Sequence, residues 1–370
     1  MTRIAHLTSA HLPFDTRIFH KECRTLAEAG YEVVLVAPHS GDETVGGIRI
    51  RAVPPARSRR ERMTRTRQAV WHAARAADAA LYHFHDPELI PVGVALKLAG
   101  KRVVYDVHED LPRQILAKPW IAPPLRRLVS LGAASTEWFA TRLFDGVVAA
   151  TPHIAGRFPP GRTVLVQNFP RRGELILPGS APYDQRPPDV AYVGGISEGR
   201  GIREMVAALG LLPADLRARL VLAGWFVPEA LEREFPGWPG GDRVAFAGRL
   251  DRDGVAALLG RARAGLVLFK PAPNHGEAQP NKLFEYMAAG IPVVASDFPL
   301  WRQVVEETGC GLVADPCNPE AIAGAVARLL HNPAEAEQMG QRGRRAVETR
   351  FNWDAEGHKL VELYRRLLGE

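Results

Sequence analysis

Short apolar segments of β type recur along the whole chain, separated by segments of helical length. In the first half they lie at residues 3–8, 32–37, 48–53, 81–84, 102–107, 146–149 and 163–166, and in the second half at 190–193, 220–223, 243–247, 265–269, 292–295 and 311–313. Two of the intervening helices have clear ends, because Gly30 follows residues 17–29 and Gly100 follows residues 88–99. This alternation predicts parallel sheets with helices on their faces.

A proline-rich stretch separates the two series of segments. It contains Pro170, Pro178, Pro182, Pro187 and Pro188 together with several glycines and arginines, a composition typical of a linker. With 370 residues the chain exceeds what one hydrophobic core usually serves. We therefore predict an α/β domain over residues 1–168, a linker over 169–187, a second α/β domain over 188–350 and a terminal helix over 351–370.

The composition excludes several classes of protein. Hydrophobic residues make up 46% of the chain and charged residues 24%, and no run of eighteen apolar residues predicts a membrane-spanning helix. The first residues follow a strand pattern without a signal-peptide core, so a cytoplasmic location is expected. Cys23, Cys310 and Cys317 have no C-x-x-C spacing, which argues against a disulfide framework and a zinc site.

The net charge of +6 is concentrated in one segment. Six arginines between Arg57 and Arg67 face only Glu61, so this arginine segment carries a charge of +5. It is either a solvated surface or a site for anionic lipid headgroups, which attract arginine by about 1 kcal/mol each. Nucleic acid is not expected as a partner, because the segment lacks aromatic side chains and the chain shows no nucleic-acid-binding motif.

Residues 270–299, KPAPNHGEAQPNKLFEYMAAGIPVVASDFP, predict a ligand loop that leads into a short helix. The prolines and glycine after the strand at 265–269 forbid regular structure. A helix then begins with Asn281 as its N-cap and ends at Gly290, which places Lys282 and Glu285 in its first turn. We expect its buried side to consist of Leu283, Phe284, Met287 and Ala288.

This junction favours a phosphorylated sugar as the ligand. A helix N-terminus attracts anions through its partial positive charge and its unpaired N–H groups, and Lys282 adds a full charge. Glu277 and Glu285 are eight residues apart, and carboxylates suit pairs of sugar hydroxyls because each accepts two hydrogen bonds. Carboxylates beside a phosphate site indicate a nucleotide sugar.

Glu277, Glu285 and the following EYMAAGIPVVAS resemble the E-x7-E signature of retaining glycosyltransferases of family 4. The resemblance implies the GT-B fold, in which two Rossmann-like parallel-sheet domains face a cleft and a C-terminal helix crosses back to the N-terminal domain. It implies transfer of a sugar from a UDP- or GDP-linked donor to a hydroxyl acceptor, without a metal or another cofactor. Bacterial polysaccharide, glycolipid or glycoside biosynthesis would use such a reaction.

The resemblance also assigns roles to residues of the second half. Glu277 is expected at the donor sugar as a catalytic residue, and Glu285 at the ribose. In YVGGISEGRGI, after the strand at 190–193, Arg200 matches the basic residue that holds the donor diphosphate. Many members have an arginine where this chain has Gly195, so we expect Lys282 or Arg249 to compensate. Gly195 and Asn281 are also expected at the diphosphate, and Leu250 and Arg249 at the base.

Two histidines follow strands in the first half, in YHFHDPEL (82–89) and VVYDVHEDLP (103–112). The resemblance favours His108 as the catalytic histidine near the donor sugar. His85 and Asp86 are expected at the acceptor pocket, and Arg17 either near an anionic ligand or in a structural ion pair. A metal site is the alternative interpretation, formed by His83, His85, Asp86, His108 and Asp110.

Two other functions remain open for a chain of this kind. One is a nucleotide-sugar epimerase of the same fold, and the other is a sugar-nucleotide-binding protein without catalytic activity. A phosphorylase of this fold would need a pyridoxal lysine, for which the sequence shows no motif. We predict a glycosyltransferase whose acceptor the sequence does not identify; a lipid-linked saccharide is one option. The arginine segment would then lie at an anionic membrane surface.

Overall fold

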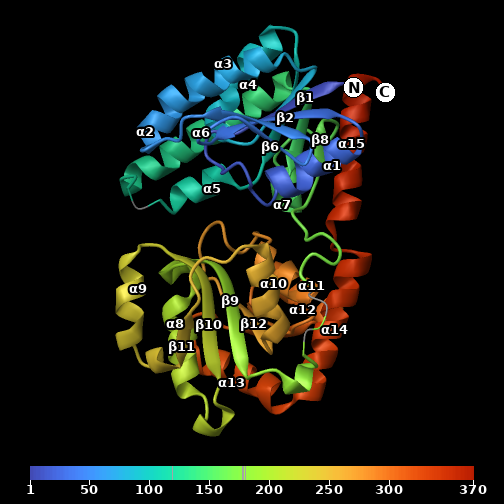
Figure 1. The fold of residues 1–370 in the computed structure, drawn as a ribbon. Helices are drawn as coiled ribbons and strands as arrows, with labels where there is room; N and C mark the ends of the chain where they lie inside the picture. Colours follow the sequence, from blue (N-terminus) through green and yellow to red (C-terminus); the bar gives the residue numbers. More distant parts are fainter. Residues whose placement is uncertain (119, 177–178, 180) are drawn as a thin grey trace. The chain divides into compact units, whose positions relative to one another are not determined.

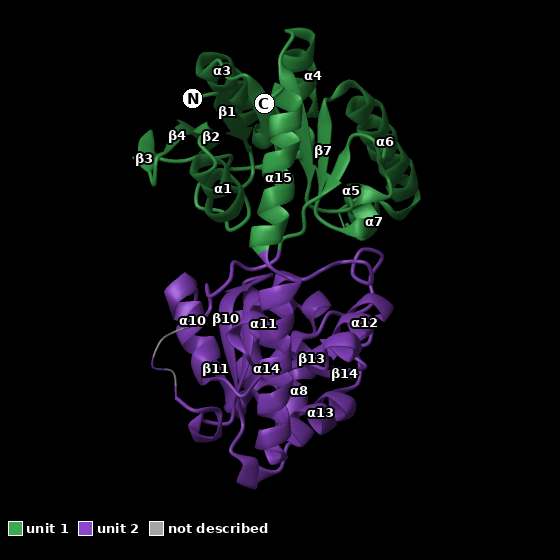
Figure 2. Cartoon of the chain, turned by 90° about the vertical axis from the view of Figure 1, so that its right-hand side faces the viewer, with its two compact units in different colours: residues 1–168, 353–370 green, residues 169–352 purple. Residues whose placement is uncertain are grey.

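The structure is a computed structural model that describes the chain except for residues 119, 177–178 and 180. It divides into two compact units (Figure 2). Unit 1 consists of Met1–Asn168 and Trp353–Glu370, and unit 2 of Phe169–Asn352. Each unit is an α/β domain around its own sheet, as the alternating sequence pattern predicts (Figure 1).

Unit 1 contains an eight-stranded sheet in the order β3-β4-β2-β1-β5-β6-β7-β8. All neighbouring strands are parallel except the β3–β4 pair. The short antiparallel strand β3 was not expected from the sequence. The strands are β1 (Arg3–Leu7), β2 (Glu32–Pro38), β3 (Glu43–Val45), β4 (Ile48–Val53), β5 (Leu81–Phe84), β6 (Arg102–Val107), β7 (Gly146–Ala149) and β8 (Thr163–Leu165).

Helices cover both faces of this sheet. One core lies under α3, α4, α6 and α7, and the other under η1, α1 and α15. Their bounds are η1 (Ile18–Cys23), α1 (Arg24–Glu28), α2 (Arg59–Glu61), η2 (Arg62–Thr66), α3 (Arg67–Ala77), η3 (Pro87–Leu89), α4 (Ile90–Leu98), α5 (Leu111–Leu116), α6 (Pro123–Leu143), α7 (Pro152–Ala155) and α15 (Trp353–Leu368).

The terminal helix α15 belongs to unit 1, which confirms that the chain crosses back to its N-terminal domain (Figure 2). Its apolar side packs into the core that also holds Ile4 and Ile18, through Trp353, Leu360 and Leu363. These leucines recur at helical spacing, so one side of the helix is apolar along its length. The helix begins at Trp353 rather than at residue 351, because the chain before it still packs in unit 2.

Unit 2 contains a six-stranded parallel sheet in the order β11-β10-β9-β12-β13-β14. This order is that of the doubly wound Rossmann fold, in which ligands bind beyond the carboxyl ends of the strands where the order reverses. In unit 2 that point lies between β9 and β12. The strands are β9 (Asp189–Ile196), β10 (Arg219–Phe226), β11 (Val244–Phe246), β12 (Ala264–Val267), β13 (Val293–Ser296) and β14 (Gly311–Ala314).

The helices of unit 2 lie on both sides of its sheet. The short ones are η4 (Tyr183–Gln185), η5 (Glu198–Arg200), η6 (Ala214–Leu216), α9 (Ala230–Glu234), η7 (Phe235–Gly237) and η8 (Gly241–Arg243). The longer ones are α8 (Ile202–Leu211), α10 (Arg252–Arg261), α11 (Asn281–Ala289), α12 (Pro299–Thr308), α13 (Pro319–His331) and α14 (Pro333–Thr349). No helix in the described part of the chain has both the length and the apolar character needed to cross a bilayer.

Two expectations about chain organisation are wrong. Residues 169–187 do not form a separate linker where they are described, because Phe169, Leu175 and Tyr183 are buried in the core of unit 2. Residues 177–178 and 180 of that stretch lie outside the described residues. The N-cap of α11 is Pro280, and Asn281 is already the first helical residue, without a side-chain cap.

Candidate functional site

A buried lysine lies at the carboxyl end of the unit 2 sheet. Lys282 stands in the first turn of α11, and its side chain is enclosed, with the residue 7% exposed. Its Nζ lies 3.5 Å from the ring centroid of Tyr192 on β9. Within the described residues this Nζ has no hydrogen-bond partner. An ammonium group enclosed without an acceptor is costly, so the arrangement suits an anion that supplies one.

A glycine pair leaves room beside this lysine. Gly194 has a positive φ of 115°, and a Cβ at this position would lie 3.6 Å from the Nζ of Lys282. Arg200 Nη1 donates a hydrogen bond of 3.0 Å to the carbonyl oxygen of Gly195, and a Cβ on residue 195 would lie 2.6 Å from the same nitrogen. The missing side chain at Gly195 therefore lets Arg200 fold back over the turn. Three of the expected diphosphate residues, Gly195, Arg200 and Lys282, meet in this corner.

The surroundings of Lys282 disfavour its charged form. Burial lowers the pKa of Lys282 well below its usual range, the positive charge of Arg200 lowers it further, and Glu285 opposes the shift. The nearby aromatic rings of Tyr192 and Phe269 offer only weak compensation to the ammonium. An arriving diphosphate would stabilise the ammonium, because opposite charges favour the ionised state.

The expected ribose carboxylate is held by an arginine. Glu285 Oε1 lies 2.7 Å from Arg252 Nη1 at the start of α10, and Arg252 Nη2 lies 2.7 Å from Glu174 Oε1. The chain therefore fixes the Glu285 carboxylate in position while leaving it half-buried rather than enclosed. Glu277 and Asn281 are exposed, in the loop before α11 and at its first residue. Both are accessible to a ligand.

The residues expected at the base follow β11. Leu250 is half-buried and packs on the core of unit 2, whereas Arg249 is exposed. The guanidinium carbon of Arg249 lies 4.9 Å from the ring centroid of Trp225 on β10. Trp225 is 46% exposed and offers a flat apolar surface. This tryptophan was not singled out from the sequence, although an aromatic side chain directly after Gly224 at a strand end was the available signal.

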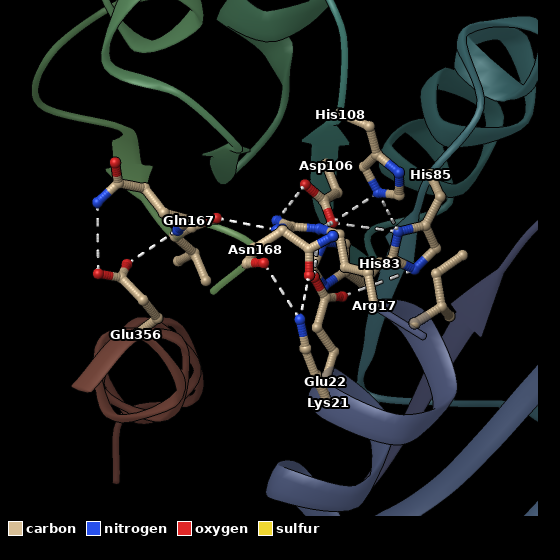
Figure 3. Close-up of polar contacts among 12 residues, drawn as sticks. Arg17, Lys21, Glu22, His83, His85, Asp106, His108, Gln167, Asn168 and Glu356 are labelled. Carbon is tan, nitrogen blue, oxygen red and sulfur yellow. Dashed lines mark hydrogen bonds and ion pairs between the residues drawn. The ribbon is translucent and has the colours of Figure 1, made fainter. Parts of the chain in front are cut away.

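In unit 1, buried histidines surround a carboxylate at the ends of β1, β5 and β6 (Figure 3). Asp106 Oδ2 lies 3.0 Å from His108 Nε2 and 3.2 Å from His85 Nδ1. His85 Nε2 lies 3.0 Å from His6 Nδ1. Tyr364 of α15 completes the series, because its hydroxyl lies 3.1 Å from His6 Nε2 and 2.8 Å from His83 Nδ1.

The partners of this series assign the tautomers. Asp106 only accepts, so His108 donates from Nε2 and His85 from Nδ1. His85 then accepts from His6 Nδ1, and His6 accepts from the hydroxyl of Tyr364. His85 and His6 are therefore neutral, because each accepts through one ring nitrogen. His108 is the partly exposed member of the series.

The pKa shifts agree with neutral His6, His83 and His85 beside an ionised Asp106. Burial lowers the pKa of His85 to about 4, although its hydrogen bond to Asp106 opposes the shift. Burial also lowers the pKa of His6 and His83 well below their usual range. Burial alone would raise the pKa of Asp106, but Arg17 and then His108 hold it well below its usual range.

The expected ligand role of Arg17 is wrong, because its side chain is buried and fully engaged. Its Nε and Nη2 bond to both oxygens of Asp106 at 3.1 and 3.0 Å, and its Nη1 donates to Val166 O. Its Nε also lies 2.9 Å from Glu22 Oε1. The two carboxylates share one arginine, and burial followed by Asp106 raises the pKa of Glu22 well above its usual range. Arg17 is therefore a structural ion-pair partner.

His85 and Asp86 also do not offer free side chains to an acceptor. His85 lies behind His108, between Asp106 and His6. Asp86 is buried, and its Oδ2 accepts hydrogen bonds from the Thr8 hydroxyl at 2.8 Å and from the Ser9 backbone N–H at 2.6 Å. Both residues therefore position neighbouring groups: His85 lies beside His108, and Asp86 holds Thr8 and Ser9.

The histidine cluster also contains the residues best placed to hold a metal. Glu22, His83, His85 and Asp106 offer ligand atoms within 4.8 Å of one another. This set differs from the one expected from the sequence, since Asp110 caps α5 and pairs with His153 and Arg157 instead. Asp106 already accepts from Arg17, His85 and His108, so a cation would have to displace them.

The sequence did not reveal the roles of Asp106, Glu22, Tyr364, Arg252 and Glu174. Their partners are far away along the chain, as His83 and Tyr364 show with a separation of 281 residues. The only local signal was the aspartate two positions before His108 in YDVHED. Side chains two apart on a strand point to the same face, which brings Asp106 under His108.

Two family profiles match this chain. The profile described as "Glycosyl transferases group 1" matches residues 175–346, and "Glycosyltransferase Family 4" matches residues 16–160. The chain belongs to the GT-B glycosyltransferases of family 4. The two profiles lie on the two Rossmann-like units of this family 4 chain, one on each.

Two relatives of this family 4 chain are about one quarter identical to it. Glycogen synthase of Mycobacterium tuberculosis is 25% identical over 302 residues, which cover 80% of the chain and 66% of the relative. The match thus spans just under two thirds of that enzyme. Phosphatidyl-myo-inositol mannosyltransferase of Mycobacterium leprae is 24% identical over 309 residues, which cover 78% of the chain and 73% of the relative.

A solved structure shows the same fold over the full length. Sucrose-phosphate synthase from Thermosynechococcus elongatus is 22% identical to this chain. The structural alignment covers 100% of each chain and has a TM-score of 0.81. This agreement confirms the predicted architecture of two Rossmann-like domains. At this identity it is evidence on the fold of the family 4 chain and not on its substrates.

Proposed function

We propose that the chain is a retaining glycosyltransferase that moves a sugar from a UDP- or GDP-linked donor to a hydroxyl acceptor. The observation that carries this proposal is Lys282, whose buried Nζ has no partner in the described chain and lies beside Arg200 and the Gly194–Gly195 turn. Two cations and the N-terminus of α11 form a site for two linked phosphates. The family 4 profiles support the same interpretation.

The reaction needs stabilisation of a leaving diphosphate. As the bond between the sugar and the donor breaks, negative charge grows on the diphosphate oxygens, and preorganised cations can stabilise it by several kcal/mol. Arg200 and Lys282 are assigned to this task. Glu285 is assigned to the ribose hydroxyls, with its carboxylate oriented by Arg252. Glu277 and His108 are assigned to the donor sugar. We propose front-face attack by the acceptor, without a covalent sugar–enzyme intermediate.

The proposed reaction needs no metal or other cofactor, because Arg200 and Lys282 supply positive charge at the diphosphate. Transfer should then persist in EDTA at the rate seen without it. Loss of transfer on chelation, with recovery on addition of magnesium or manganese, would contradict this part of the proposal. The group around Glu22, His83, His85 and Asp106 is where such an ion would be sought.

We further propose that the acceptor belongs to polysaccharide or glycolipid biosynthesis and that the protein is cytoplasmic and peripheral on the membrane. The mannosyltransferase among the relatives is named for a phosphatidyl-inositol lipid, which supports a lipid-linked acceptor. The arginine segment supports attraction to anionic headgroups, since Arg57, Arg59, Arg60 and Arg65 are exposed. Arg62 is paired with Glu88 and contributes less.

The proposal is tested by a thermal-shift series with UDP, GDP, dTDP and ADP. The matching nucleotide stabilises the folded chain, by about 2.7 kcal/mol at one hundred times its Kd. Lys282→Met should abolish most of this shift, whereas the control Lys101→Met, on the exposed side of unit 1, should keep it. No shift with any nucleotide, or an equal shift in both variants, would contradict the assigned site.

Incubation with the donor alone separates the remaining functions. A nucleotide-sugar epimerase would change the configuration of the donor sugar, and a binding protein would leave it intact. A transferase would at most hydrolyse it slowly and would consume it once an acceptor is supplied. Epimerised donor in the mixture would overturn the proposed transfer.

A further inference from the structure

Helix α6 of unit 1 has an unusual distribution of side chains, because its buried side is polar. The residues that face the interior are Ser130, Glu137, Ala140 and Thr141. Their polar atoms have partners there: Ser130 Oγ donates to Pro112 O at 2.8 Å, and Glu137 accepts from the Tyr105 hydroxyl at 3.1 Å. A surface helix normally buries its apolar side instead.

The opposite side of α6 is apolar and exposed. Leu125, Leu128, Phe139 and Leu143 share one face by helical spacing, and their exposed fractions lie between 51% and 68%. Leu131 and Trp138 extend this face on one flank and Val129 on the other, and all three are exposed. We call these seven residues the apolar stripe. Figure 1 shows that α6 runs along the outside of the unit.

Positive charges accompany the apolar stripe. Arg127 and Arg142 are exposed on α6, and the guanidinium carbon of Arg142 lies 3.2 Å from the ring centroid of Trp138. Glu137 is the one acidic residue between 123 and 143, all of which are described, and it is buried against Arg157. The accessible surface of the helix therefore carries only positive charge.

The arginine segment adjoins this surface through Trp120. This tryptophan is exposed just before α6, and its ring centroid lies 4.9 Å from the guanidinium carbon of Arg59 and 5.0 Å from Lys118 Nζ. An exposed tryptophan beside cations is typical of side chains at the water boundary of a membrane. Trp120 thus joins the arginine segment to the residues that lead into α6.

We propose that α6 is a membrane-docking helix that lies in the plane of an anionic bilayer. The apolar stripe enters the boundary of the acyl chains, while Arg59, Arg127 and Arg142 contact lipid phosphates. A helix with an apolar face and a basic polar region binds membranes in this orientation. The inference deepens the proposed membrane association, on which it rests, by naming the part of the chain that enters the lipid.

A second copy of the chain fits this surface less well. In a symmetric dimer through the apolar stripe, Arg127 and Arg142 of one copy would face the same residues of the other. No exposed carboxylate of α6 is available to pair with them, and like charges across an interface disfavour association. Anionic lipid supplies the missing negative charge.

The test compares two double variants by sedimentation with vesicles of phosphatidylcholine alone and with 30% phosphatidylglycerol. Leu128→Ser/Phe139→Ser removes two side chains of the stripe, and the control Leu98→Ser/Leu211→Ser removes two exposed leucines elsewhere. We expect the partition coefficient on anionic vesicles to fall at least tenfold for the stripe variant and less than twofold for the control. Equal partition of the stripe variant and the wild type would overturn the inference.

Two further measurements distinguish failure of this inference from failure of the proposed nucleotide site and of the proposed membrane association. The stripe variant should keep the nucleotide thermal shift and the circular dichroism of the wild type, because unit 2 is unchanged. If replacing Arg59 and Arg60 by Ser abolishes binding while the stripe variant binds normally, the arginine segment alone holds the membrane and the inference fails. If the wild type binds no vesicles and sedimentation velocity shows a wild-type dimer that the stripe variant does not form, the stripe binds a second copy of the chain and the inference fails.

Discussion

The amino group of Lys282 has no hydrogen-bond partner within the described chain, although it is enclosed by Tyr192 and Phe269. Its hydrogen-bonding capacity is unmet until a ligand arrives. This residue was predicted from the sequence because the loop-to-helix pattern is local. Its low pKa could not be predicted, since that depends on burial and on Arg200, 82 positions earlier.

We predict that binding of the nucleoside diphosphate takes up a proton through Lys282. The free lysine has a lowered pKa, and the bound diphosphate raises it, so between these two values binding protonates the amine. Affinity should therefore fall as pH rises above the pKa of the free lysine. Calorimetry in two buffers of different ionisation enthalpy measures the uptake between pH 7 and 9.5.

The matched variant for this measurement is Lys282→Met, which should bind more weakly and show no dependence on the buffer. Lys101→Met should behave as the wild type. A wild-type enthalpy that is the same in both buffers over the whole pH range would contradict the prediction.

A second prediction concerns Glu285. Glu285→Ala should weaken nucleotide binding at least tenfold, about 1.4 kcal/mol, because hydrogen bonds from the ribose to a carboxylate are lost. The fold should remain, since Arg252 keeps Glu174 as a partner. Calorimetry measures the affinity, and the control Glu306→Ala alters a surface ion pair with Arg302. Unchanged affinity would remove Glu285 from the site.

At the scale of elements, strands and helices with strong local signals were predicted well. Strands β5 and β7 have the expected bounds, because short apolar runs between turns leave few alternatives. The three-residue strand β3 was missed because it has no such run. The prediction of a linker was wrong because proline content does not indicate whether Phe169 and Leu175 pack into a hydrophobic core. The side-chain distribution on α6 also required the structure, since the sequence does not say which side faces inward.

A buried hydroxyl of helix α15 bonds to two histidines of unit 1. Tyr364→Phe would leave His6 Nε2 and His83 Nδ1 without this partner in the interior. We expect unit 1 to lose about 1–3 kcal/mol of unfolding free energy, the cost of unsatisfied buried polar groups. Urea unfolding followed by circular dichroism measures it.

The control for this prediction is Tyr31→Phe. Its hydroxyl also reaches the end of the chain, at Glu370 Oε2, but in a less buried place. Tyr31→Phe should lower the unfolding free energy by less than half as much as Tyr364→Phe. Equal unfolding curves for wild type and Tyr364→Phe would show that the hydroxyl does not hold the helix.

At the scale of the whole molecule, unit 2 is a continuous segment and unit 1 is not. We predict that residues 169–352 expressed alone fold and keep the nucleotide thermal shift, because Lys282, Arg200, Glu285 and Arg252 all belong to them. Residues 1–168 expressed alone should fail to fold cooperatively, since the core under α15 stays open. The same thermal-shift series and urea unfolding test both fragments. Loss of the shift in isolated unit 2 would mean that unit 1 contributes to nucleotide binding.

The discontinuity of unit 1 also sets an order of events during synthesis. Residues 169–352, a stretch of 184, are made between the two parts of unit 1. At about 5–20 residues per second this interval lasts roughly 10–40 s. During this interval α15 has not yet been made. The residues that it will cover, which include Ile4, Ile18 and His83, are therefore still exposed to solvent. Unit 1 is thus begun first and finished last, because its core closes only when α15 has been made.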